Sequence, residues 1–249
     1  MSASTILKAV DLGKAFGGVH ALDRVSFELT EGELLGVIGP NGAGKTTFVN
    51  LITGFVKPTS GRIFYKGKDI TNWPPYKIIG LGISRTFQMV KPFHHLPAYK
   101  NIIIPLYSPR AKGLMGGKYG DRNAVALDLL EEVGFERDSF VAYKEARALP
   151  QGYLKRLELA KAMALQPDLL ILDELFSGLS LAEVASLVPI IEKLRMEGKT
   201  IIMIEHRLKE LFRVADRLLV LNYGRKIAVG KAADVMESRE VKEAYLGSE

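Results

Sequence analysis

The stretch GPNGAGKTT at residues 39–47 constrains the fold of this chain more than any other feature. It follows the apolar run ELLGVI (33–38) and precedes a helical pattern, TTFVNLITG, and its spacing is that of a phosphate-binding loop. Glycines let successive N–H groups face an anion, Lys45 supplies a charge for the β- and γ-phosphates, and the Thr46 hydroxyl suits Mg²⁺. The residues expected to bind the nucleotide here are Gly39, Pro40, Asn41, Gly42, Ala43, Gly44, Lys45, Thr46 and Thr47.

An acidic pair follows a second apolar run, LLILDELFSG, at residues 169–178. Asp173 would hold Mg²⁺ through water, and Glu174 would orient or deprotonate the attacking water. Two carboxylates after four apolar residues can also be no more than the end of a strand, and the pair alone does not distinguish the two. Beside a phosphate loop, the pair favours nucleotide hydrolysis.

Apolar runs alternate with helical spacing along much of the chain. Continuous runs are typical of strands buried on both faces, as in a parallel sheet, whereas RVSFEL (24–29) alternates and suits a half-exposed strand. Buried strands are expected at 33–38, 168–174, 200–205 and 217–222. Helices are expected at 45–54, 123–133, 154–165, 183–197 and 207–214. The alternation predicts an α/β fold with a mostly parallel sheet.

The middle of the chain has a different character. Between about residues 90 and 165 there are helical patterns and loops but no convincing buried strand, and PLYSPRAKGLMGGKYGDR (105–122) suggests a mobile loop. We therefore divide the chain into three parts. They are a nucleotide-binding core (1–88 and 166–225), a helical insertion (89–165) and a helical tail (226–249).

With these motifs in this order, the chain resembles the ATP-binding subunits of ABC transporters over nearly its whole length. The resemblance implies a P-loop NTPase core of the RecA-like type, with a mostly parallel sheet, an N-terminal antiparallel β portion and a helical insertion subdomain. It also implies ATP and Mg²⁺ as cofactors. By resemblance, Phe16 in KAFGG stacks on adenine, Gln88 in ISRTFQ senses Mg²⁺ and the attacking water, and His206 in IIMIEHRL contacts the γ-phosphate.

The stretch RALPQGYLKRLELAKA (147–162) looks like the start of a helix that carries no nucleophile, acid or metal ligand. By itself it is either a capped surface helix or an anion site. It occupies the position of the family signature, Leu-Ser-Gly-Gly-Gln, which caps the γ-phosphate bound to the other subunit. By resemblance, Gln151 and Gly152 would contact the partner's ATP in trans. Pro150 stands where the family has serine and lacks both a hydroxyl and an N–H donor.

Two further positions depart from the family pattern. Leu175 stands where proline usually follows the glutamate, and Ser180 stands where the loop that crosses to the partner usually has Asp or Asn. Neither change removes a group that must touch phosphate. The second could weaken communication between the two sites.

Finer similarity points to the ATPase subunits of branched-chain amino acid importers. It rests on FGGVHALDRVSF, IGPNGAGKTTFVNLITG, SRTFQMVKPF, IEHRL, ADRLLVLNYGRKIAVG and EAYLG. The resemblance implies a second ATP-binding subunit. This subunit is either a second copy of the chain or a different chain, and the altered signature favours a different one. It also implies two membrane permease subunits, an external solute-binding protein and a place at the cytoplasmic face of the membrane. The segment after Gln88, with Met89, Phe93 and Leu96, is expected to be exposed and to dock on the permeases, although packing inside the helical insertion is the alternative.

Composition and length argue against several other classes of function. There is no cysteine, hence no disulfide or thiolate metal site, and neither a signal-type N-terminus nor a membrane-spanning run is expected. The net charge of +6 is scattered, without the basic and aromatic interleaving of nucleic-acid binding. A soluble ABC protein of DNA repair or translation usually needs a long coiled coil or two ATPase halves, which 249 residues do not accommodate. A non-hydrolysing subunit is the third interpretation: the altered signature allows it, and the intact Lys45, Asp173, Glu174 and His206 argue against it.

Overall fold

The computed structural model describes residues 4–114, 121–137 and 139–246. Six strands form a sheet in the order β10-β9-β3-β8-β7-β6, in which only β10 runs antiparallel to its neighbour. Their bounds are β3 (Leu34–Ile38), β6 (Ile83–Arg85), β7 (Leu169–Asp173), β8 (Thr200–Ile204), β9 (Arg217–Asn222) and β10 (Arg225–Gly230). The predicted α/β class with a mostly parallel sheet is confirmed.

The central strands are apolar throughout because both faces of this sheet are covered. Every residue of β3, β7 and β8 is buried. Neighbouring residues of one strand enter opposite halves of the core: Leu34 packs with one cluster of buried side chains and Leu35 with the other. The parallel sheet is thus the layer between two hydrophobic cores.

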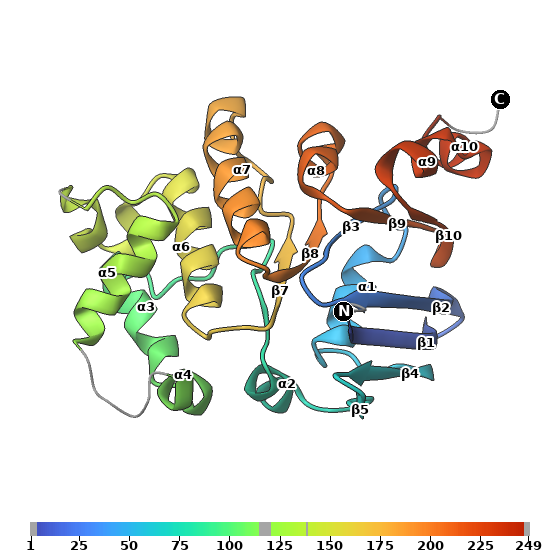
Figure 1. The fold of residues 1–249 in the computed structure, drawn as a ribbon, viewed down its shortest axis with the longest axis horizontal. Coiled ribbons are helices and arrows are strands. Elements are labelled where there is room, and N and C mark those ends of the chain that lie inside the picture. The colour runs from blue at the N-terminus through green and yellow to red at the C-terminus, as the bar shows by residue number, and fades with distance from the viewer. Residues whose placement is uncertain (1–3, 115–120, 138, 247–249) are drawn as a thin grey trace.

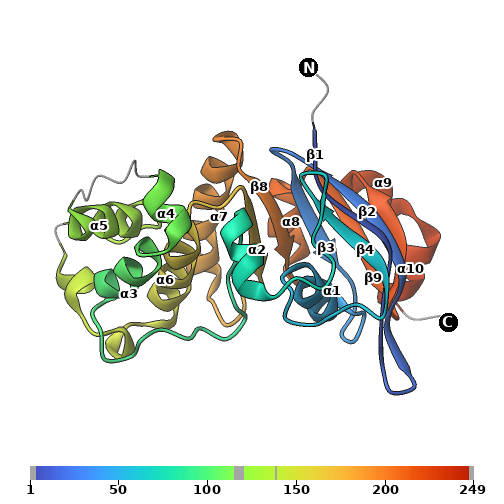
Figure 2. The same cartoon turned by 90° about the horizontal axis from the view of Figure 1, so that it is seen from below.

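A second, antiparallel sheet covers one face of the parallel sheet, as the resemblance implied (Figures 1 and 2). Its strand order is β2-β1-β4-β5, and its members are β1 (Thr5–Phe16), β2 (Val19–Thr30), β4 (Ser60–Tyr65) and β5 (Lys68–Asp69). Strand β2 alternates between buried and exposed positions, which confirms the half-exposed strand predicted at 24–29.

Helices flank both sheets, and several of them gather at one end of the molecule (Figure 1). Those of the core and tail are α1 (Lys45–Ile52), α2 (Pro75–Leu81), α7 (Leu181–Met196), α8 (Leu208–Val214), α9 (Ala232–Glu237) and α10 (Arg239–Leu246). Those at the far end are α3 (Ala98–Leu106), α4 (Pro109–Leu114), α5 (Arg122–Glu132), α6 (Gln151–Met163) and the short 3₁₀ turns Phe140–Tyr143 and Ala146–Ala148.

Two sequence-based expectations are wrong. The tail 226–249 is not wholly helical, because its first residues form β10, which pairs with β9 as a hairpin. Residues 105–122 are not one loop: α3 continues to Leu106, and α4 follows. The remainder of that predicted loop, 115–120, lies outside the described residues. In the described part of 89–165, the only strand-like pairing is an isolated bridge between Pro97 and Glu145.

Candidate functional site

The phosphate loop joins β3 to α1, as predicted. All three of its glycines hold backbone angles that other residues seldom adopt, with φ of 154° at Gly39, 80° at Gly42 and 101° at Gly44. A side chain at Gly39 would collide with the carbonyl oxygen of Leu221, and a Cβ at Gly44 would lie 2.5 Å from the carbonyl oxygen of Ala21. The two glycines therefore allow this loop to lie close against neighbouring backbone.

Lys45 folds back over the loop. Its Nζ donates to the carbonyl oxygens of Gly39 at 2.7 Å and Pro40 at 2.9 Å. Burial lowers the pKa of Lys45, and the nearby carboxylates of Glu174 and Asp173 act in the opposite direction. The ammonium is thus anchored at the loop, where it can meet a phosphate.

The start of α1 fits an anion. Gly44 caps the helix without any side-chain hydrogen bond, and the first turn holds no acidic residue. The first N–H groups of a helix have no partner within it, and they carry a partial positive charge. A cavity of about 380 Å³ opens at this point. Its lining residues are Val19, His20, Ala21, Asn41, Gly42, Ala43, Gly44, Lys45, Thr46, Thr47, Glu174, His206 and Tyr223.

Three predicted catalytic side chains converge beside this cavity. Gln88 Nε2 donates to Glu174 Oε2 at 2.6 Å, and His206 Nε2 lies 3.0 Å from Glu174 Oε1. These residues follow the adjacent parallel strands β6, β7 and β8, whose carboxyl ends meet at one edge of the sheet. Sequence positions that are more than 80 residues apart are thereby joined in one cluster.

Asp173 lies next to this cluster but is held by another residue. Its Oδ2 forms an ion pair with Nη2 of Arg85 at 2.7 Å, and both side chains are almost fully buried. Burial raises the pKa of Asp173, while the guanidinium of Arg85 counteracts that rise. The sequence analysis did not single out Arg85. The only signal was a charged residue at the end of the three-residue strand β6.

Phe16 does not join the cluster. It lies at the end of β1, half-exposed at 50%, and is absent from the lining of the cavity. Its ring instead has Lys14 Nζ 4.9 Å from the centroid. The residues that line the cavity include Val19 and His20 at the start of β2 and Tyr223 between β9 and β10.

The signature segment also lies away from the cavity of its own chain. Helix α6 begins at Gln151 with Pro150 as its cap, three residues earlier than the predicted start, so Gln151 and Gly152 form the first turn. Gln151 is exposed and Gly152 is buried. A Cβ on Gly152 would lie 2.5 Å from Oε1 of Glu183. The close approach of Glu183 in the same chain therefore also explains why this position is glycine.

The two departures after the acidic pair have clear places in the fold. Ser180 caps α7: its hydroxyl oxygen accepts the backbone N–H of Glu183, and its own backbone N–H donates to the carboxylate of Glu183, which together form a capping box. Leu175 is buried in the core beside Phe176. Ser180 thus serves as a helix cap, a role that Asp or Asn also fills.

A phosphate loop at the start of a helix, followed across the sheet by a carboxylate that bonds Gln88 and His206, defines a P-loop nucleotide-binding protein built for hydrolysis. The sequence profile described as "ABC transporter" matches residues 22–177. The chain belongs to this family, and it is a transporter ATPase.

Individual relatives agree over nearly the full length. The high-affinity branched-chain amino acid transport ATP-binding protein BraF of Pseudomonas aeruginosa is 35% identical, with 97% of this chain and 98% of BraF covered. LivG of Salmonella typhimurium, which bears the same description, is 36% identical over 93% of this chain and 94% of its own. A crystal structure of a nucleotide-free ATP-binding cassette from an ABC transporter superimposes with a TM-score of 0.85 at 31% identity, covering 98% of this chain and 100% of that one.

Within residues 4–114, 121–137 and 139–246, none of the helices combines the length and the apolar character that crossing a lipid bilayer requires.

Proposed function

We propose that this chain hydrolyses ATP to power an importer of branched-chain amino acids or related small solutes. The observation that carries the proposal is the contact of Glu174 with Gln88 and His206 beside the phosphate loop. The solute class is supported by the names of the relatives, BraF and LivG. No residue of this chain would touch the solute.

The nucleotide phosphates would lie against the loop and the first turn of α1, where free N–H groups and Lys45 suit anionic oxygens. The predicted set from Gly39 to Thr47 supplies these groups. All but Gly39 and Pro40 line the cavity, and the carbonyls of these two anchor Lys45. Phe16 remains a proposed contact for adenine, which requires the end of β1 to approach the nucleotide.

Magnesium would be held by the Thr46 hydroxyl and the Gln88 side chain, with Asp173 acting through water. The residues suit the ion, because hydroxyl, amide and carboxylate oxygens are its usual ligands. Among the described residues there is no group of three or more His, Cys, Asp or Glu side chains that could hold a metal. The ion would therefore take much of its coordination from phosphate oxygens and water, as Mg²⁺ commonly does.

In hydrolysis, Glu174 would orient and deprotonate a water molecule for in-line attack. Gln88 and His206 already bond the two carboxylate oxygens of Glu174, which limits the directions that this carboxylate can take. His206 would also reach the γ-phosphate. Bound magnesium would neutralise the charge that develops on the phosphate oxygens.

A second ATP-binding subunit would complete the site. Gln151 and Gly152 begin a helix but lie outside the cavity of their own chain, which suits a half-site that serves the partner's nucleotide. Pro150 offers no N–H and no hydroxyl there, so this half-site would hold the closed state less firmly. We therefore propose a heterodimer with two unequal sites.

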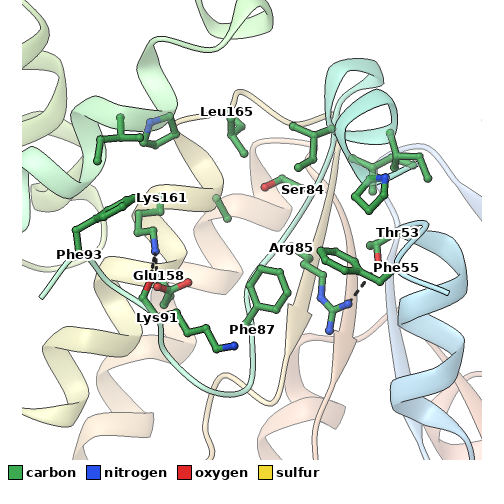
Figure 3. Close-up of a pocket in the computed structure, with 17 residues that line it drawn as sticks. Thr53, Phe55, Ser84, Arg85, Phe87, Lys91, Phe93, Glu158, Lys161 and Leu165 are labelled. Carbon is green, nitrogen blue, oxygen red and sulfur yellow. Dashed lines mark hydrogen bonds and ion pairs between the residues drawn. The ribbon is translucent and has the colours of Figure 1, made fainter. Parts of the chain in front are cut away.

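The membrane subunits would dock in a groove between the core and the helical end (Figure 3). This cavity of about 450 Å³ has apolar side chains from both sides, with Phe55 and Phe87 facing Phe93 across it (Figure 3). Phe93 was among the predicted docking residues. Met89 is exposed and Leu96 half-buried, and neither lines the groove.

The charges at the groove favour a partner of defined chemistry. Glu158 is paired with Lys161 at 2.5 Å, and Arg85 is paired with Asp173, while Lys91 adds a further positive charge. An amphipathic cytoplasmic segment of a permease, with an apolar face and an acidic residue, would match this surface. Such docking would keep the chain at the cytoplasmic face of the membrane, and the external solute-binding protein would act through the permeases.

The test is to purify the chain from native membrane, identify the subunits that accompany it, and measure ATP turnover of the chain alone and in that complex. We expect two permease subunits, a second ATPase subunit and turnover that rises in the complex. Absence of ATP turnover in the intact complex, with nucleotide still bound, would instead identify a non-hydrolysing subunit.

A further inference from the structure

Lys155 is a fully buried charged side chain that the nucleotide site does not use directly. It lies on the inner face of α6, and only 1% of its surface is exposed. Lysine is seldom buried to this degree, because removing its charge from water is costly unless it is bonded and balanced.

Both hydrogen-bond acceptors of Lys155 belong to proposed catalytic residues. Its Nζ donates to the backbone carbonyl of Gln88 and to that of Glu174, each at 3.0 Å. Burial lowers the pKa of Lys155, and the carboxylates of Glu205 and Glu174 oppose that change. One buried ammonium thus ties α6 to the two segments that carry the hydrolytic side chains.

The contact with Glu174 secures a residue of unusual backbone geometry. Glu174 has a φ of 48°, in the left-handed region that side chains other than glycine rarely adopt. Its N–H donates to the carbonyl of Ile204 at 2.9 Å, and its carbonyl accepts from Lys155. A strained conformation persists only where its surroundings fix it, and the Glu174 carbonyl is held by Lys155 together with the N–H of Ser177, which donates to it at 3.1 Å.

Helix α6 holds the segment after β6 at a second point. Lys161, almost two turns beyond Lys155, donates to the carbonyl of Lys91 at 3.2 Å. Both ends of the segment 88–91 are therefore bonded to the same rigid helix. A displacement of α6 would carry Gln88 with it.

We propose that Lys155 is a positioning residue for hydrolysis, which acts by fixing the backbone of Gln88 and Glu174 and so aligning their side chains. This inference rests on the proposed function, in which those two residues serve the attacking water. Because α6 begins at the segment proposed to cap the partner's nucleotide, movement of that helix on closure would reach the chain's own hydrolytic residues through Lys155.

The test compares Lys155→Met, which keeps length and removes the donors, with Lys155→Arg, which restores donors. ATP binding, kcat, KM and melting temperature are measured for the full chain, in its complex. We expect Lys155→Met to lower kcat about tenfold or more with KM changed less than about threefold, and Lys155→Arg to recover much of the loss. Lys155→Gln, which keeps one donor, replaces the methionine variant if that variant does not fold, and its kcat should be intermediate.

Glu33→Gln is the matched control. Glu33 is buried and pairs with Arg217 at 3.0 Å, at the opposite end of β3, so its loss should reduce stability without changing kcat. If Lys155→Met resembles this control, with a lower melting temperature and an unchanged kcat, Lys155 is only structural and the inference is wrong. Glu174→Gln in the same assay separates the two proposals, because wild-type turnover in that variant would contradict the proposed function itself.

Discussion

At the scale of single residues, Glu174 links the other two candidate catalytic side chains to the backbone around the phosphate-loop cavity. It bonds Gln88 and His206 with its carboxylate, Ile204 and Lys155 with its backbone, and it lines the phosphate-loop cavity. A carboxylate held by these contacts suits the proposed role of orienting one water molecule for attack. Its removal should therefore affect the chemistry more than the binding of nucleotide.

We expect Glu174→Gln to retain ATP binding and to lose hydrolysis by about 100-fold or more, the usual contribution of a general base. Glutamine keeps the shape and can still bond Gln88 and His206, but it cannot accept a proton. Equilibrium binding and single-turnover hydrolysis measure the two effects, with the surface change Glu197→Gln as control. The closed dimer should also persist in ATP. Unchanged turnover would rule out the assigned role.

Glu205, next to His206, gives a prediction about pH. Burial raises its pKa from the ordinary 4.5 to about 8, although the carboxylate accepts the N–H of Phe176 at 2.8 Å. Because the unfolded chain loses this proton near pH 4.5 and the folded chain near pH 8, the favourable contribution is complete below 4.5 and is lost as pH rises towards 8.

Glu205→Gln keeps the acceptor for Phe176 and has no proton to lose. Relative to wild type, we expect its free energy of unfolding to increase with pH between 5 and 8, by at most about 1.4 kcal/mol per pH unit, the slope for one proton. Urea unfolding at several pH values measures this difference. Parallel curves for the two proteins across that range would show that Glu205 is already ionised in the fold.

At the scale of elements, α6 connects several functions along one helix. Its first turn is the proposed half-site for the partner, and Lys155 bonds the backbone of Gln88 and Glu174, the proposed hydrolytic residues. Glu158 and Lys161 lie in the proposed docking groove (Figure 3). Its start is closely packed against α7 through Gly152 and Glu183.

Gly152→Asp tests the role of this helix start. The new carboxylate would repel the partner's γ-phosphate, so we expect hydrolysis to fail at the partner's site in the assembled pair while the isolated subunit still binds ATP. Glu183 complicates the change, because the added Cβ would lie 2.5 Å from its carboxylate. Gly152→Ala has the same steric contact without the charge, and a Glu183→Gln background removes the repulsion within the chain.

ATP titration of the isolated variants and turnover of the assembled pairs distinguish the outcomes. If hydrolysis at the partner's site is lost with Gly152→Asp but not with Gly152→Ala, in both the wild-type and the Glu183→Gln background, the effect is due to charge at the partner's phosphate. Weaker ATP binding by a folded, isolated Gly152→Asp subunit would mean that the helix start serves its own site.

At the scale of the whole molecule, the proposed docking groove lies between the core and the helical end, so motion of one part relative to the other would displace a segment bound there. Phe93 contributes to its lining and is 51% exposed, whereas Phe140 is 82% exposed and lies outside the groove. These two residues form a matched pair for testing the surface.

We expect Phe93→Asp to abolish assembly with the permeases or transport, because a charge would be desolvated in an apolar groove. Phe140→Asp should leave both intact. Co-purification and vesicle uptake measure the effects, and circular dichroism with ATP binding confirms the fold of each variant. If transport and assembly survive Phe93→Asp, the docking surface lies elsewhere.

The sequence by itself determined the elements whose information is local. The glycine spacing of the phosphate loop identified the junction of β3 and α1, and unbroken apolar runs identified β7, β8 and β9, because strands buried on both faces need apolar side chains at every position. The candidates Gln88, Glu174 and His206 were also found from motifs. Their joint place at one sheet edge followed once their strands were seen to be neighbours.

Only the tertiary structure decided the contacts that join distant segments. Strand β10 has no unbroken apolar run, and pairing with β9 rather than its own pattern makes it a strand. Lys155 looks like any helical lysine in the sequence, and Arg85 like the end of a short strand. Their roles depend on which backbone carbonyls and carboxylates the fold brings within hydrogen-bond distance, over separations of up to 88 residues, and no local pattern encodes such a distance.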